Sequence, residues 1–180
     1  SDLNLLRVDG SWRIWEEDSL LPIMQIGELP LRNCISYRNG PNCDCLLSCF
    51  DANKKLVFIE HNGKIVFRAI IRLTKGSFVA ADERKTIEFV DVTAKSKSRE
   101  NKAEELVLFL ERYYQSGLNE QEIQKAVNLT VMLVREKAEK LGARVVLSRR
   151  YKNVLENKNY VLTNFYIYIS ASKNGSQYLD

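Results

Sequence analysis

Four cysteines lie close together near the start of the chain, and thiols can bind metal or act as nucleophiles. They are Cys34, Cys43, Cys45 and Cys49, with eight, one and three residues between them. Four thiolates can complete a tetrahedral zinc site, but structural zinc sites usually use two closely spaced pairs, which this spacing lacks. We therefore expect no metal, and we expect Cys45 and Cys49, one helical turn apart, to be small buried side chains. A zinc-stabilised interaction domain is the alternative. A nucleophilic cysteine would depend on the single histidine, His61, as its base.

Two groups of basic side chains could bind an anion. Arg68 and Arg72 share one face of a predicted strand with apolar neighbours, so their stems can equally lie over apolar surface. The second group alternates with serines and consists of Lys95, Lys97 and Arg99. The net charge of +4, from 27 basic and 23 acidic residues, permits an anionic partner but falls well below that of a dedicated nucleic-acid-binding domain.

The strongest signal for an element is a long helix that leads into a short buried strand. Asn119 and Glu122 have the spacing of a capping box, in which each side chain bonds the other residue's backbone N–H. Apolar residues then recur at helical spacing up to Leu141, and Gly142 follows, where a left-handed residue would end the helix. The apolar run 145–147 is too short for a helix, which predicts an interior strand.

A second clear signal is a tight hairpin. Asn62-Gly63 suits the two positive-φ positions of a type I′ turn, and it separates the strand-like segments 56–61 and 64–73. The second segment alternates apolar residues with a mixed face that carries both arginines, so we expect that face to be covered in part.

The remaining segments give weaker signals. Residues 11–26 predict a strand or loop followed by a short helix, and residues 160–170 predict a closing strand. Residues 75–100 resemble an inserted excursion, with strand character from Thr86 to Val92. Residues 106–114 fit either a helix or a buried strand; we favour the strand, because it would complete a β-α-β crossover through the long helix.

The bulk composition bounds the class of protein. At 180 residues and 45% hydrophobic, the chain is long enough for one domain with a proper core. No apolar run is long enough to span a membrane and no signal peptide is evident, so we expect no membrane partner and a cytoplasmic location. The chain opens at Ser1-Asp2, which is compatible with a domain excised from a larger protein.

The order of these elements resembles the GNAT (GCN5-related N-acetyltransferase) fold over roughly residues 55–170. The hairpin around Asn62-Gly63, the helix and strand from Val127 to Ser148, and Tyr151 just beyond them carry the resemblance. It implies an α/β (α+β) fold, with a mixed, mostly antiparallel sheet and a long central helix.

The resemblance also implies a ligand and its contacts. In that family the pyrophosphate of an acyl-CoA binds backbone amides just before the long helix, where free N–H groups and the helix dipole converge. The matching residues are Gln115, Ser116, Gly117, Leu118 and Asn119, which contain one glycine where the family's motif has two.

The implied activity is acyl transfer from acetyl-CoA to a small-molecule or peptide amine. Such a reaction needs a base to deprotonate the amine and an acid to protonate the departing thiolate. Glu111, at the end of the strand before the helix, is the candidate base, and Tyr151 matches the family's usual acid. The alternative is a non-catalytic module on the same scaffold that binds nucleic acid or protein, because a fold does not settle an activity.

Overall fold

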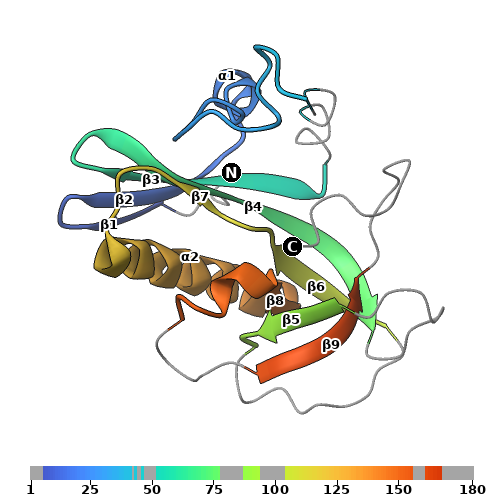
Figure 1. Cartoon of the computed structure of the whole chain (residues 1–180). Coiled ribbons are helices and arrows are strands. Elements are labelled where there is room, and N and C mark those ends of the chain that lie inside the picture. The colour runs from blue at the N-terminus through green and yellow to red at the C-terminus, as the bar shows by residue number, and fades with distance from the viewer. Residues whose placement is uncertain are drawn as a thin grey trace. The chain divides into compact units, whose positions relative to one another are not determined.

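The computed structural model describes residues 6–41, 43, 46, 52–77, 87–93, 104–155 and 161–167, which form two compact units. Unit 1 comprises Ser1–Ile71 and Tyr113–Thr130, and unit 2 comprises Arg72–Arg112 and Val131–Asp180. The boundary falls inside one strand, β4 (Lys64–Ser77), and inside one helix, α2 (Glu120–Leu141), so both elements contribute to both units. Figure 1 shows the elements with their labels.

Unit 1 is built from strands that pair in the order β1-β2-β3-β4, with a short fifth strand on the other side of β4. The bounds are β1 (Leu6–Asp9), β2 (Trp12–Glu17), β3 (Lys54–His61) and β7 (Tyr114–Gln115). The antiparallel registers place Trp12 opposite His61 and Phe67 opposite Gln115. The predicted hairpin is confirmed, since Asn62 and Gly63 join β3 to β4 with φ of 51° and 74°.

The alternation along β4 is also as predicted. Phe67 and Ala69 on one face are fully buried, and Arg68 on the mixed face is 1% exposed. The Arg68 guanidinium lies 4.0 Å from the centre of the Tyr114 ring, and its Nε donates to the Leu29 carbonyl at 2.9 Å. A buried arginine therefore fastens the segment around Leu29 to this strand.

That segment follows the short helix α1 (Leu20–Met24) and is tightly folded (Figure 1). The Gly40 amide donates to the Ser36 carbonyl at 2.8 Å, and the Asn33 amide donates to the Gly27 carbonyl at 2.9 Å. The backbone approaches itself so closely that only glycine fits at two places. A Cβ on Gly40 would lie 2.4 Å from the Cys34 carbonyl oxygen, and one on Gly27 would lie 2.5 Å from the Ile35 carbonyl oxygen.

Replacing Gly40 by alanine should therefore destabilise the protein by about 2 kcal/mol, because backbone atoms must move to admit the methyl group. Urea unfolding followed by circular dichroism measures this loss. Asn39→Gly is the matched control in the same loop, since Asn39 has φ of 83° and glycine adopts that conformation without strain. An alanine variant as stable as the wild type would show that the loop is looser than described.

Glu17 terminates β2 and holds the turn into α1. Its carboxylate accepts hydrogen bonds from the Ser19 amide at 2.8 Å, the Asp18 amide at 3.1 Å and the Trp15 indole at 3.2 Å. Burial by itself would raise the pKa of Glu17, but the hydrogen bonds from Ser19, Trp15 and Asp18 outweigh it and lower the pKa below its usual 4.5.

This shift makes the stabilisation by Glu17 depend on pH. Because the folded-state pKa lies below the unfolded value, the stabilisation is present above pH 4.5 and is lost as the pH falls through the folded-state pKa. Glu17→Gln should therefore be less stable than the wild type at neutral pH, and the difference in unfolding free energy should shrink on acidification. A difference that stays constant across the acid range would contradict this origin.

The helix α2 has the ends that the sequence predicts. The Asn119 amide donates to Glu122 Oε2 at 2.9 Å, and the Glu122 amide donates to Asn119 Oδ1 at 3.0 Å, so the capping box is confirmed. At the other end Gly142 has φ of 66°, and the Ala143 amide reaches back to the Ala138 carbonyl at 2.9 Å.

Unit 2 contains a parallel pair of strands. This pair, β6 (Glu105–Leu110) and β8 (Arg144–Leu147), is joined through α2, which confirms the β-α-β crossover. The segment 106–114 is a strand as expected only as far as Leu110, since residues 111–113 leave the strand before β7 begins. Beyond β8 the order continues with β5 (Ile87–Asp91) and β9 (Val161–Ile167). Because β9 also pairs with β4, these pairings close a ring of five strands.

A buried ionic network joins three strands of unit 2. Arg144, 4% exposed, donates to Asp91 Oδ2 at 2.8 Å and to Glu105 Oε1 at 2.6 Å. Burial lowers the pKa of Arg144, but the hydrogen bond to Glu105 and the charges of Asp91 and Glu105 outweigh it and raise the pKa. The network ties β8 to β5 and β6 at one end of the parallel pair.

Taken together, the described residues form an α+β structure with a mixed sheet and one long helix. The excursion 75–100 contributes β5, within the predicted strand 86–92. Among these residues no helix is long and apolar enough to cross a membrane.

Candidate active site

Glu111, the candidate base, directly follows β6 and is buried in unit 2, with 4% of its surface exposed. Its Oε1 accepts a short hydrogen bond from Nη2 of Arg72, which is itself 3% exposed. The pair connects the end of β6 to β4. A carboxylate is a group that can accept a proton, which is what a general base requires.

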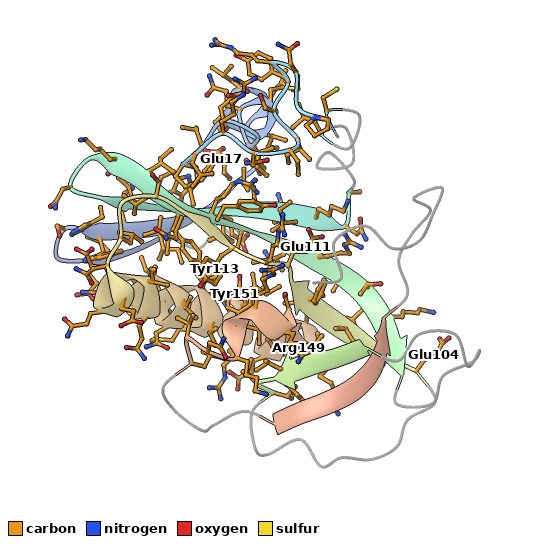
Figure 2. All side chains as sticks on the ribbon, in the orientation of Figure 1. Glu17, Glu104, Glu111, Tyr113, Arg149 and Tyr151 are labelled. Carbon is orange, nitrogen blue, oxygen red and sulfur yellow. The ribbon has the colours of Figure 1, made fainter. Side chains whose placement is uncertain are left out.

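Tyr151, the candidate acid, lies in the short 3-10 helix η2 (Arg149–Tyr151) that follows β8 (Figure 2). The β6–β8 pairing ends where the Ser148 amide donates to the Leu110 carbonyl at 3.0 Å. Just beyond this point the Tyr151 hydroxyl donates to the backbone carbonyl of Glu111 at 2.8 Å. The structure thus brings the two predicted catalytic residues together at the ends of the parallel strands. The contact joins the Tyr151 hydroxyl to the Glu111 backbone carbonyl and does not involve the Glu111 carboxylate.

Both groups are held by contacts that also serve the fold. Tyr151 has no exposed surface, and its hydroxyl proton is committed to a carbonyl. Both side chains are buried, so neither is accessible to a substrate in the arrangement described. Arg72 offers a further contact: its Nε is buried with no hydrogen-bond partner among the described residues. An acceptor atom placed beside it would gain a bond without breaking one.

The predicted pyrophosphate loop lies in unit 1, and several of its amides have protein partners. The Ser116 amide donates to the Val66 carbonyl at 2.9 Å, and the Leu118 amide donates to Gln115 Oε1 at 3.3 Å. The Asn119 amide belongs to the capping box. Gly117 has φ of 73°, which favours glycine there.

Three amides at this helix end remain for a ligand. Gly117, Glu120 and Gln121 donate to no acceptor within the described part of the chain, and a helix N-terminus favours an anion through its dipole. The carboxylates of Glu120 and Glu122 oppose that attraction by like charge. The helix end therefore presents three amides to an anion, beside two carboxylates that oppose its binding.

The residues proposed for nucleic-acid binding are not gathered on a described surface. Arg68 and Arg72 are buried, the first over Tyr114 and the second against Glu111. Contact with nucleic acid through either would require a buried interaction to break. Lys95, Lys97 and Arg99 lie outside the described residues.

The cysteines likewise fall partly outside the described residues. Cys34 is half-buried and Cys43 is exposed, whereas Cys45 and Cys49 are not described. Within the described segments no three histidine, cysteine or acidic side chains converge in a way that could hold a metal ion.

Sequence reasoning missed the surroundings of His61. Its ring stacks on Trp12 with centroids 4.0 Å apart, its Nδ1 lies 3.0 Å from Ser11 Oγ, and its Nε2 lies 3.8 Å from Glu122 Oε1. Two hairpin turns and the first turn of α2 therefore meet at this imidazole. Predicting these contacts would have required the pairing of β2 with β3, which places Trp12 opposite His61. The sequence of neither strand specifies that pairing by itself.

Comparison of the chain with family models, with curated proteins and with solved structures found no match.

Proposed function

We propose that this chain is a GNAT-like N-acyltransferase that moves the acyl group of an acyl-CoA, such as acetyl-CoA, to a small-molecule or peptide amine. The observation that carries the proposal is the meeting of Glu111 and Tyr151 at the ends of the parallel strands β6 and β8. The hairpin β3–β4, then β6, α2, β8 and β9 follow one another in the order on which the resemblance is based.

The two residues have chemically complementary parts in this reaction. Glu111 takes a proton from the amine as its nitrogen forms a bond to the thioester carbonyl carbon. The carbon–sulfur bond then breaks, and Tyr151 gives its hydroxyl proton to the departing thiolate. Arg72 keeps the Glu111 carboxylate oriented through the buried ion pair. The amides of Gly117, Glu120 and Gln121 are the groups in unit 1 that would bind the pyrophosphate.

The test is chromatographic measurement of free CoA released from acetyl-CoA in the presence of a panel of primary amines. Tyr151→Phe should lower the rate about 100-fold, because it removes the proton donor and keeps the ring. Tyr113→Phe is the matched control, since the Tyr113 ring stacks on Phe67 at 5.1 Å and a phenylalanine keeps that stack (Figure 2).

Two results would contradict the proposal. One is the absence of amine-dependent CoA release by the folded wild-type chain. The other is release that Tyr151→Phe and Tyr113→Phe reduce equally, because the hydroxyl of Tyr151 would then have no special part in the reaction.

A second candidate function is a non-catalytic module that binds nucleic acid or protein. The burial of both Glu111 and Tyr151, and the side chains that already cap two loop amides, favour it. If it holds, acetyl-CoA at high concentration will leave the melting temperature unchanged, whereas a true ligand of the folded state must raise it by mass action.

A further inference from the structure

Three side chains of unit 1 form an exposed cluster in the loop after α1. They are Arg32, Tyr37 and Arg38, and the Tyr37 side chain is 45% exposed. Arg38 Nε donates to the Tyr37 hydroxyl at 2.9 Å, and the Arg38 guanidinium carbon lies 5.4 Å from the centre of the ring. Arg32 Nη2 donates a short hydrogen bond to the Arg38 carbonyl. The contacts hold two cations and one aromatic ring together.

The two guanidinium groups differ from most of the cations described above. Arg72 and Arg144 each pair with a carboxylate. So does Lys125, whose Nζ lies 2.8 Å from Asp9 Oδ2. No carboxylate of the described residues pairs with Arg32 or Arg38. Each therefore keeps N–H donors available to an anion from outside the chain.

The backbone that carries the cluster is fixed before any partner arrives. Ser36 is fully buried, and its hydroxyl accepts from the Arg38 amide at 3.2 Å. The close approaches at Gly27 and Gly40 lock the loop on either side. Little conformational entropy would then be lost at this surface on binding, which favours affinity.

We propose that Arg32, Tyr37 and Arg38 form a binding site for single-stranded nucleic acid. Guanidinium groups bind phosphates through paired N–H donors, and an exposed aromatic ring stacks on an unpaired base of any sequence. An acidic peptide would satisfy the two arginines but would offer the Tyr37 ring no planar partner. A duplex would offer phosphates but keep its bases stacked on one another.

This site is independent of the acyltransferase proposal. None of its three residues takes part in the chemistry assigned to Glu111 and Tyr151 or in the amides assigned to pyrophosphate. Loss of CoA release in Tyr151→Phe and loss of nucleic-acid binding in the loop variants are therefore separate results, and either proposal can fail alone.

The test is fluorescence anisotropy of a fluorescein-labelled oligothymidylate of about 20 nucleotides, long enough for a site of this class. Arg32→Ala/Arg38→Ala should weaken binding at least about tenfold and should reduce the slope of log affinity against log salt by about 1.4, or 0.7 for each phosphate lost. Tyr37→Ala should weaken binding about tenfold, whereas Tyr37→Phe keeps the ring and should bind nearly as well as wild type.

The matched control is Arg149→Ala/Arg150→Ala, which removes the same charge from two exposed side chains of unit 2. It should weaken binding less than about threefold if the loop is the site, since only the long-range field changes. Circular dichroism checks that each variant is folded.

The proposal is overturned if wild type fails to bind the oligonucleotide, or if the control loses as much affinity as the loop variant. If the protein bound a duplex of the same length as tightly as the single strand, Tyr37 would not stack on an unpaired base. Equal affinity for a labelled oligoglutamate would reassign the surface to an acidic protein partner.

Discussion

Replacing Arg144 by methionine should lower the free energy of unfolding by about 3–5 kcal/mol, the usual cost of breaking a buried ionic network by removing one partner. The substitution keeps much of the side-chain volume and removes every hydrogen bond. It leaves Asp91, which is 9% exposed, and Glu105 without the cation that neutralises them. Urea unfolding monitored by circular dichroism measures the loss.

Two further variants serve as a control and as a rescue of the loss in stability. Arg149→Met removes an exposed cation a few residues away and should change the stability by less than about 0.5 kcal/mol. Adding Asp91→Val and Glu105→Leu to Arg144→Met should recover part of the loss, because the stranded carboxylates are then gone. If Arg144→Met alone is as stable as wild type, the network is not closed as described.

Replacing Glu111 by leucine should also cost about 3–5 kcal/mol, because the Arg72 guanidinium would stay buried without its carboxylate. The double variant Arg72→Met/Glu111→Leu should be more stable than Glu111→Leu alone, since it removes the unpaired charge. With Arg72→Met as the second single variant, the double-mutant cycle separates the coupling of the pair from the effects of each side chain.

A third substitution, Glu111→Gln, tests the role of Glu111 in catalysis. Glu111→Gln keeps the size of the side chain and a hydrogen-bond acceptor but cannot take up a proton as a base. If Glu111 is the base, Glu111→Gln should lose acyl transfer while remaining folded. For the stability cycle, an Arg72→Met/Glu111→Leu variant no more stable than Glu111→Leu would show that Arg72 and Glu111 are not coupled.

The elements predicted from sequence are those with signals contained in a few neighbouring residues. The capping box at Asn119 and Glu122, the left-handed Gly142 and the Asn62-Gly63 turn each specify local geometry by themselves. The β6 segment was ambiguous from its own residues. The crossover resolves the ambiguity. The helix α2 connects this segment to β8, and two parallel neighbouring strands need such a connection, so the segment has to be a strand.

The site contacts could not be predicted because they join residues far apart in the chain. Arg72 and Glu111 are separated by 39 positions, and Arg144 and Asp91 by 53. Alternation along β4 placed Arg72 on a partly covered face, but nothing local selected its carboxylate. The folded loop after α1 was also missed, because the close approaches at Gly27 and Gly40 depend on tertiary contacts rather than on a turn motif.

The acyltransferase proposal depends first on whether the folded chain binds an acyl-CoA, and isothermal titration calorimetry of acetyl-CoA measures that directly. We predict a saturable isotherm with one site per chain, absent for acetyl-pantetheine, which lacks the pyrophosphate. No heat of binding at millimolar acetyl-CoA, with the wild-type chain shown to be folded, would contradict it.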